Sequence, residues 1–160
     1  MRLEGSCHCK KVVFSLVSQT PCPFMQCYCS ICRKTAGSGG FAINLGGEAK
    51  SLQVTGKEHI RVYHARMDDG DGNVTTSQAE RHFCGHCGSA LWLWTKQSPK
   101  LIHPHASAID TPLPIPPKRV HMMLKYAANW VDRAHSDDQN FEEYPAESLQ
   151  QWHQRHHLMQ

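Results

Sequence analysis

The sequence contains no apolar run of the length that a membrane span needs, which is roughly 18 residues. Its first apolar segment, residues 12–17, is also too short for the core of a signal peptide, and no small-residue cleavage site follows it. With 17 basic and 14 acidic residues, the formal net charge is only +3, and the basic residues are scattered. The sequence therefore indicates neither a membrane nor a nucleic-acid partner, and we expect a cytoplasmic protein.

Cysteine, in contrast, is abundant, with eight residues in a chain of 160. A domain of this length buries roughly two thirds of the surface of its unfolded form, so it does not need cross-links in order to fold. In a reducing compartment disulfides are rare, and clustered thiols usually bind metal or take part in chemistry. The cysteines therefore predict zinc binding by a single domain that covers residues 1–160.

Short segments rich in β-branched and aromatic residues predict a mostly β fold. The predicted strands are Lys11–Val17, Phe41–Leu45, Ile60–His64 and Ala90–Trp94, with Val120–Lys125 as a further candidate. Glycine-rich and polar segments separate them, and we find no internal repeat.

Two segments are expected to depart from this pattern. Six of the nine prolines fall in residues 99–117, which predicts an irregular, extended segment there. A short helix is predicted only near the C-terminus, with Pro145 in its first turn and Leu149, Trp152 and His156 on one face.

Two other patterns resemble metal sites but fit them poorly. Counted from Asp69, the stretch to Glu80 partly matches a calcium loop, but valine occupies the position of the sharp-turn glycine. We interpret this stretch as a solvated hairpin tip. His153, His156 and His157 have no cysteine nearby that could complete a site, so we interpret them as a solvated helix end.

The cysteines themselves form three clusters with different spacings. Cys7 and Cys9, at i and i+2 of an extended segment, point to the same side. Cys84 and Cys87 enclose Gly85, which suits a tight turn. Zinc takes four tetrahedral ligands, at about 2.3 Å when they are thiolates. We therefore predict that these four cysteines hold one structural zinc ion and tie the start of the chain to its middle.

The remaining cluster, Cys27, Cys29 and Cys32, supplies only three sulfurs. Three protein ligands with an open fourth position are typical of catalytic zinc, and a thiol or water bound there becomes acidic and nucleophilic. Alternatively, Cys22, which lies five residues earlier between two prolines, completes a second structural site. The spacing leaves both hypotheses open, and each of them predicts two zinc ions per chain.

Three segments occur in this order: GSCHC from Gly5, CYCSICRKTAGS from Cys27 and FCGHCGSALW from Phe83. They resemble the glutathione-dependent formaldehyde-activating enzyme family, which includes the centromere protein V group. Asp110-Thr111-Pro112 and the stretch from His121 to Trp130 resemble later motifs of the same family. The resemblance covers residues 5–130.

The resemblance implies the β-tent fold, a mostly β zinc-binding fold that methionine-R-sulfoxide reductases and yippee-like proteins share. It implies structural zinc ligation by Cys7, Cys9, Cys84 and Cys87 and catalytic zinc ligation by Cys27, Cys29 and Cys32. The implied activity is that of a carbon–sulfur lyase, which adds the thiol of glutathione to formaldehyde and gives S-(hydroxymethyl)glutathione.

Glutathione carries carboxylates, and Arg33 and Lys34 directly follow the third cysteine of their cluster as cations that can meet one of them. The alternative for this pair is a solvated surface position. For the reaction, a different thiol or aldehyde is an alternative. For the function as a whole, the alternative is a non-catalytic zinc-binding module for a protein or chromatin partner. The sequence predicts no oligomeric state.

Overall fold

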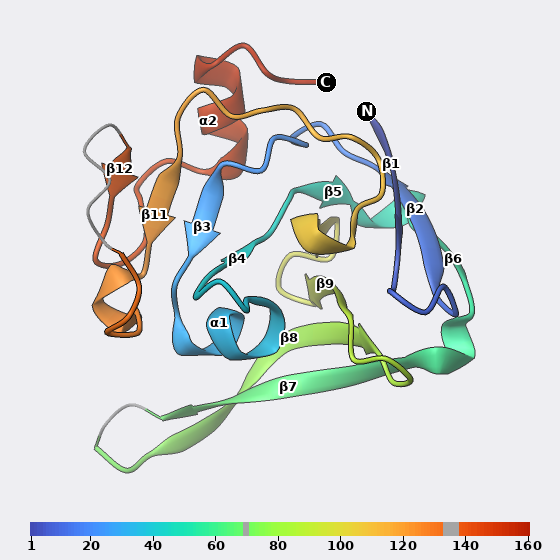
Figure 1. The fold of residues 1–160 in the computed structure, drawn as a ribbon, viewed down its shortest axis with the longest axis horizontal. Helices are drawn as coiled ribbons and strands as arrows, with labels where there is room; N and C mark the ends of the chain where they lie inside the picture. Colours follow the sequence, from blue (N-terminus) through green and yellow to red (C-terminus); the bar gives the residue numbers. More distant parts are fainter. Residues whose placement is uncertain (69–70, 133–137) are drawn as a thin grey trace.

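The computed structural model describes residues 1–68, 71–132 and 138–160, and its strands form three β-sheets (Figure 1). The first sheet has the strand order β1-β2-β6, formed by Arg2–Ser6, Val13–Val17 and Gln53–Thr55. The second has the order β5-β10-β9-β8-β7, formed by Gly47–Glu48, Leu101–Pro104, Ala90–Thr95, Val74–Cys84 and Ile60–Asp68. The third has the order β12-β11-β3-β4, formed by Gln139–Asn140, Val120–Met122, Met25–Cys27 and Ala42–Ile43.

The helices are short. The described residues form two α-helices, α1, Ser30–Ala36, and α2, Leu149–Arg155. They also form four 3₁₀ turns: η1, Ala49–Ser51; η2, Lys57–His59; η3, Ala106–Ala108; and η4, Leu124–Tyr126. Within the described residues, no helix has the length and apolar character needed to cross a membrane.

The mostly β prediction is confirmed, and each predicted strand segment contains a strand, although the bounds differ. The largest difference is in β7, which continues to Asp68 and pairs with β8 as a long hairpin that projects from the rest of the molecule in Figure 1. The register pairs Asp68 with Val74. The hairpin interpretation of this stretch is therefore confirmed, and Asp69, the first position of the rejected calcium loop, lies outside the described residues.

The proline-rich segment is irregular only in part, which corrects the prediction for its first residues. Leu101–Pro104 form β10, which lies between β5 and β9. Pro104 occupies the last position of this strand, where the missing N–H interrupts no further pairing, and its carbonyl accepts a hydrogen bond from the N–H of Leu45 at 2.9 Å. Residues 99–100 before this strand form a turn, and after the 3₁₀ turn η3 the chain is irregular up to β11, apart from a single bridge between Gly5 and Ile109.

The C-terminal helix is confirmed, but two details of the prediction are wrong. Ser148 caps α2 in a capping box with Gln151, so Pro145 lies outside the helix and not in its first turn. Furthermore, His153 is fully buried and not solvated. The reason is that its neighbour Trp152 stacks on Phe24, with 3.7 Å between the ring centroids, and this contact brings one face of α2 against the protein.

The main apolar core lies between the first two sheets. It contains Leu3, Phe14, Leu16, Leu45, Leu91, Trp92 and Ile102, together with Cys7 and Cys84. Gly5 allows the first strand to approach this core closely, because a Cβ atom there would lie 2.4 Å from the ring of Phe14. Two smaller clusters surround Trp152 and the pair Cys27 and Cys32. Cysteines therefore lie within the packed interior, where their sulfurs are held in fixed positions.

Candidate functional site

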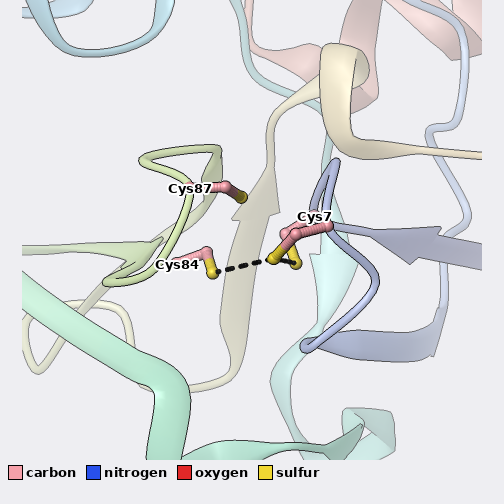
Figure 2. A group of neighbouring side chains, drawn as sticks. Cys7, Cys84 and Cys87 are labelled. Carbon is pink, nitrogen blue, oxygen red and sulfur yellow. Dashed lines mark hydrogen bonds between the residues drawn. The ribbon is translucent and has the colours of Figure 1, made fainter.

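Two turns bring together the sulfurs of Cys7, Cys9, Cys84 and Cys87, and all four sulfurs lie within 4.8 Å of one another. Figure 2 shows Cys7 on one side and Cys84 and Cys87 on the other, with their side chains directed toward one another. The Sγ atoms of Cys7 and Cys9 are 3.5 Å apart, and those of Cys9 and Cys84 are 3.8 Å apart. In a tetrahedron with zinc–sulfur distances of about 2.3 Å, the sulfurs lie about 3.8 Å apart. The donor set and its spacing thus fit zinc.

Backbone hydrogen bonds shape both turns of this four-cysteine group. The N–H of Val12 donates to the Sγ of Cys7 at 3.2 Å, and the N–H of Gly88 donates to the carbonyl of Cys84 at 2.8 Å. Gly88 has a φ of +77°, a conformation that glycine adopts without strain. The hydroxyl and N–H of Ser89 hydrogen-bond the sulfur of Cys87 and lower its pKa to about 5, which favours the thiolate that a metal requires.

The sulfurs of Cys27, Cys29 and Cys32 form a second group, also within 4.8 Å of one another. Cys27 ends β3, Cys29 is the N-cap of α1 and Cys32 lies in its first turn. The Sγ of Cys29 accepts a hydrogen bond from the N–H of Cys32 at 3.4 Å. This sulfur cap starts a helix that the sequence analysis did not predict, because cysteine is not among the usual capping residues.

The ionisation of these three thiols is coupled. Hydrogen bonds from the thiols of Cys27 and Cys32 lower the pKa of Cys29 to about 2. The same interactions, together with burial, raise the pKa of Cys27. One thiolate thus forms readily at the expense of the others, and three thiolates in this space require a cation among them. The group therefore fits a metal ion as well.

Cys22 is not part of the three-sulfur group. Its side chain is buried beside Phe24 and Trp152, and its Sγ lies 3.8 Å from the carbonyl oxygen of Pro114. Burial raises the pKa of its thiol to about 11. In the described part of the chain, no fourth cysteine, histidine or acidic side chain joins Cys27, Cys29 and Cys32.

Arg33 and Lys34 line an open cavity of about 620 Å³ that lies between α1 and the four-cysteine group. Arg33 is half-buried, and Lys34 is exposed. Lys10 adds a third cation on this wall, although it is paired with Asp110 at 3.4 Å. The cavity is rich in serine hydroxyls, from Ser6, Ser38, Ser89 and Ser107. The sulfurs of the three-cysteine group do not line it, so the structure brings the two predicted cations to a polar cavity beside the helix and not to the sulfurs themselves.

Two polar side chains that the sequence analysis missed contact the sulfur of Cys32. The two terminal nitrogens of Arg81 lie 4.0 and 3.9 Å from this sulfur, and Arg81 Nη1 also donates to the hydroxyl of Thr35 at 3.3 Å. The amide nitrogen of Asn44 lies 3.9 Å from the same sulfur. Neither residue lies in a cysteine motif, so no spacing signal identifies them. Arg81 places a permanent positive charge beside the three-cysteine group.

Comparison with known proteins agrees with this geometry. Residues 2–125 match the family described as "Glutathione-dependent formaldehyde-activating enzyme". A protein of Halomonas elongata named "Putative glutathione-dependent formaldehyde-activating enzyme" is 53% identical over 156 residues, which are 97% of this chain and 96% of the relative. The crystal structure of a Rhodobacter sphaeroides protein superposes with a TM-score of 0.52 at 22% identity, over 71% of this chain and 92% of that chain, and this likeness concerns the fold alone.

The match to the family extends over most of the chain and includes all seven cysteines of the two sulfur groups. The identity to the Halomonas relative covers nearly the whole length of both proteins. On this evidence the chain belongs to the glutathione-dependent formaldehyde-activating enzyme family.

Proposed function

We propose that this protein is a zinc-dependent carbon–sulfur lyase that joins glutathione and formaldehyde, or a similar small aldehyde, to S-(hydroxymethyl)glutathione. The observation that carries the proposal is the group of three sulfurs from Cys27, Cys29 and Cys32, which has no fourth ligand among the described residues. Three protein ligands and one open position are what a catalytic zinc site needs, whereas four ligands close a structural site.

In this proposal the seven clustered cysteines divide into two roles and hold two zinc ions per chain. Cys7, Cys9, Cys84 and Cys87 would hold a structural ion, and Cys27, Cys29 and Cys32 a catalytic ion. When bound at the open site, zinc would lower the pKa of a thiol ligand and so increase its nucleophilicity. The guanidinium of Arg81, within 4.0 Å of the Cys32 sulfur, would favour the thiolate form of that ligand.

Arg33 and Lys34 would hold glutathione through one of its carboxylates. Their cavity has room for a tripeptide, at about 620 Å³, and its serine hydroxyls can hydrogen-bond the peptide groups. An arginine can bind a carboxylate through two parallel hydrogen bonds, which would orient the peptide as well as attract it. The cation pair thus supplies binding and orientation, while the chemistry takes place at the sulfurs.

The reaction is a simple addition, and its atoms balance without a further reactant. The thiol of glutathione loses its proton, and the sulfur forms a bond to the carbonyl carbon. The π electrons of the carbonyl move to its oxygen, which takes up a proton. We place this reaction in the cytoplasm, since none of the eight cysteines forms a disulfide and a reducing compartment keeps them in this state. Residues 1–160 would act as one domain.

Two-dimensional exchange NMR can test the proposal, because it measures exchange between free and glutathione-bound formaldehyde in the presence of the spontaneous reaction. Catalytic amounts of zinc-loaded protein should accelerate this exchange above the protein-free blank. The Cys32→Ser variant should return the rate to the blank, whereas Cys22→Ser, which changes a thiol outside both sulfur groups, should not. No acceleration by folded, zinc-loaded protein, with several thiols and aldehydes, would instead favour a non-catalytic binding module.

A further inference from the structure

A small cavity of about 220 Å³ adjoins the cavity of Arg33 and Lys34, with which it shares Thr35, Gly88 and Ala90 in its walls. Thr35, Tyr63, Arg81 and His105 are among the residues that line it. Arg81 connects it to the sulfurs, because its guanidinium reaches within 4.0 Å of the Cys32 sulfur and 3.3 Å of the Thr35 hydroxyl. The space has room for a small organic molecule, since a cavity of about 150 Å³ already holds a benzene ring.

His105 is the most unusual residue of this wall. Its side chain is 2% exposed, and its Nδ1 atom has no hydrogen-bond partner among the described residues. Burial and the charge of Arg81 lower its pKa to about 4, so the ring is neutral near neutral pH. A neutral imidazole offers one N–H donor and one acceptor. Since burying a polar nitrogen without a partner is unfavourable, a molecule in the cavity is expected to supply that partner.

Asn44 provides a second buried polar atom without a partner. It forms an isolated antiparallel bridge with His105, and residues that pair in this way project their side chains to the same side. The amide nitrogen of Asn44 is directed toward the Cys32 sulfur at 3.9 Å, while its Oδ1 atom is buried without a partner in the described part of the protein. Arg81 and Asn44 therefore border the sulfur of Cys32, while Arg81 and His105 line the cavity.

We propose that this cavity is the binding site of the small carbonyl substrate, an aldehyde or its hydrate, whose oxygen accepts hydrogen bonds from Arg81 and from Nδ1–H of His105. The inference rests on the proposed function, and it assigns a second subsite to the aldehyde. A molecule held there contacts Arg81, whose guanidinium also lies within 4.0 Å of the Cys32 sulfur.

The arrangement also suits the change of charge during the addition. As the carbon–sulfur bond forms, the π pair of the carbonyl moves to the oxygen, which becomes negative until the proton released by the glutathione thiol completes the hydroxyl. A fixed guanidinium stabilises this charge more than it stabilises the neutral carbonyl, and it needs no reorganisation at that moment. Arg81 and His105 are therefore assigned as residues that touch the substrate oxygen.

Binding can be tested without turnover by titration with formamide, a neutral carbonyl compound of similar size to which thiols do not add. In ¹H–¹⁵N NMR spectra of the zinc-loaded protein, formamide should shift resonances around this cavity in a saturable way, at millimolar concentration. His105→Ala should abolish the saturation, and His105→Asn, whose amide lies near the Nδ1 position, should restore it. His103→Ala is the matched control, since His103 lines a different cavity beside Leu149. Absence of saturable shifts, or equal shifts with His105→Ala, would overturn the proposal.

Kinetics then tests the assignment to the aldehyde. His105→Ala should raise the KM for formaldehyde about tenfold, the effect of one lost hydrogen bond, and leave the KM for glutathione unchanged. Equal increases in both KM values would contradict a separate aldehyde subsite. If the wild-type protein shows no turnover at all, the proposed function fails, and the formamide titration still decides whether the cavity binds a carbonyl compound.

Discussion

The backbone N–H of Cys22 donates a hydrogen bond to Nε2 of His153 at 3.0 Å, although 131 residues separate the two in the chain. The other ring nitrogen of His153, Nδ1, lies 2.8 Å from the carbonyl oxygen of Leu149. Because Nε2 accepts, Nδ1 carries the proton and donates, so this pair of bonds requires the neutral ring. His153 thereby attaches the C-terminal helix to the segment that precedes the three-cysteine group.

This hydrogen bond helps to explain the buried position of Cys22 without a role as a metal ligand. Its backbone is held by His153, and its thiol packs against Phe24 and Trp152. We therefore expect Cys22→Ser to retain both zinc ions and most of the activity, and to lower the free energy of unfolding by about 1 kcal/mol through the exchange of a buried thiol for a hydroxyl. Elemental analysis should give two zinc ions per chain for both proteins, with the same number of sulfurs per metal in X-ray absorption. Loss of one zinc ion from folded Cys22→Ser would make Cys22 a ligand and remove the open site.

A pH dependence of stability follows from the same ring. Burial lowers the pKa of His153, and nearby His156 acts in the same direction. The unfolded chain, in which histidine titrates near 6.5, thus binds more protons than the folded protein as the pH falls. The contribution of the neutral ring is complete above about pH 6.5 and is lost as the pH falls from there toward the lower pKa of the folded state.

His153→Gln should remove this dependence, since glutamine can accept the same hydrogen bond without titrating. Denaturant unfolding of both proteins between pH 7 and pH 5 measures the difference. The free energy of unfolding of the wild type should fall more steeply, by up to about 1.4 kcal/mol per pH unit. Acid releases zinc from both proteins alike, so only the difference between the two slopes reports on His153, and equal slopes would contradict this account.

The features that could be predicted from the sequence are those that depend on residues close together in the chain. The two sulfur groups could be predicted, because CxC and CxxC spacings fix the positions of neighbouring sulfurs over a few residues. The role of Arg81 could not be predicted. Its contact with Cys32, 49 residues away in the sequence, depends on the packing of a strand against α1. The burial of His153 could not be predicted either, because most of its neighbours in the sequence are polar. This burial depends on the stacking of Trp152 on Phe24. Strands were recognisable where β-branched residues occur together with other apolar residues, whereas Val74, Thr75 and Thr76 in the outer part of the β7–β8 hairpin are exposed and lie among polar residues.

The two sulfur groups should differ in their importance for folding. Cys9 and Cys84 connect turns that are 75 residues apart, whereas Cys27, Cys29 and Cys32 lie in one short segment. Closing a long loop removes more conformational freedom from the unfolded chain than closing a short one, and the difference grows with the logarithm of the loop length. Zinc coordination of the structural type contributes on the order of 10 kcal/mol in small domains, so loss of the four-cysteine site should be severe.

Cys9→Ser and Cys29→Ser form a matched pair for this comparison, because both side chains are half-buried. Serine can also replace Cys29 as the helix cap. We expect Cys9→Ser to unfold the protein or to lower its melting temperature strongly. Cys29→Ser should remain folded, with about one zinc ion per chain and no activity. Circular dichroism and zinc analysis provide the measurement, and similar destabilisation by both changes would mean that the division into structural and catalytic groups is wrong.

The assignment of Arg33 and Lys34 to glutathione can be tested through the carboxylates of the peptide. Arg33→Ala and Lys34→Ala should each raise the KM for glutathione about three- to tenfold, the range for a partly exposed charge-assisted hydrogen bond. The KM for formaldehyde should not change. Lys50→Ala is the control, since Lys50 is an exposed cation beside Glu48 and lies outside this cavity. A surface role for the pair would instead leave every KM value unchanged.

Modified thiols then identify the carboxylate by a double-mutant cycle. Glutathione monoethyl ester lacks the glycyl carboxylate, and cysteinylglycine lacks the γ-glutamyl carboxylate. If Arg33 pairs with the glycyl carboxylate, the KM for the ester should already be raised with the wild-type protein, and Arg33→Ala should raise it no further. The KM for cysteinylglycine should still rise when Arg33 is replaced by alanine. The γ-glutamyl group would give the opposite result. Additive effects with both thiols, for Arg33→Ala and for Lys34→Ala alike, would show that neither cation contacts a carboxylate, and the cavity between α1 and the four-cysteine group would then not be the glutathione site.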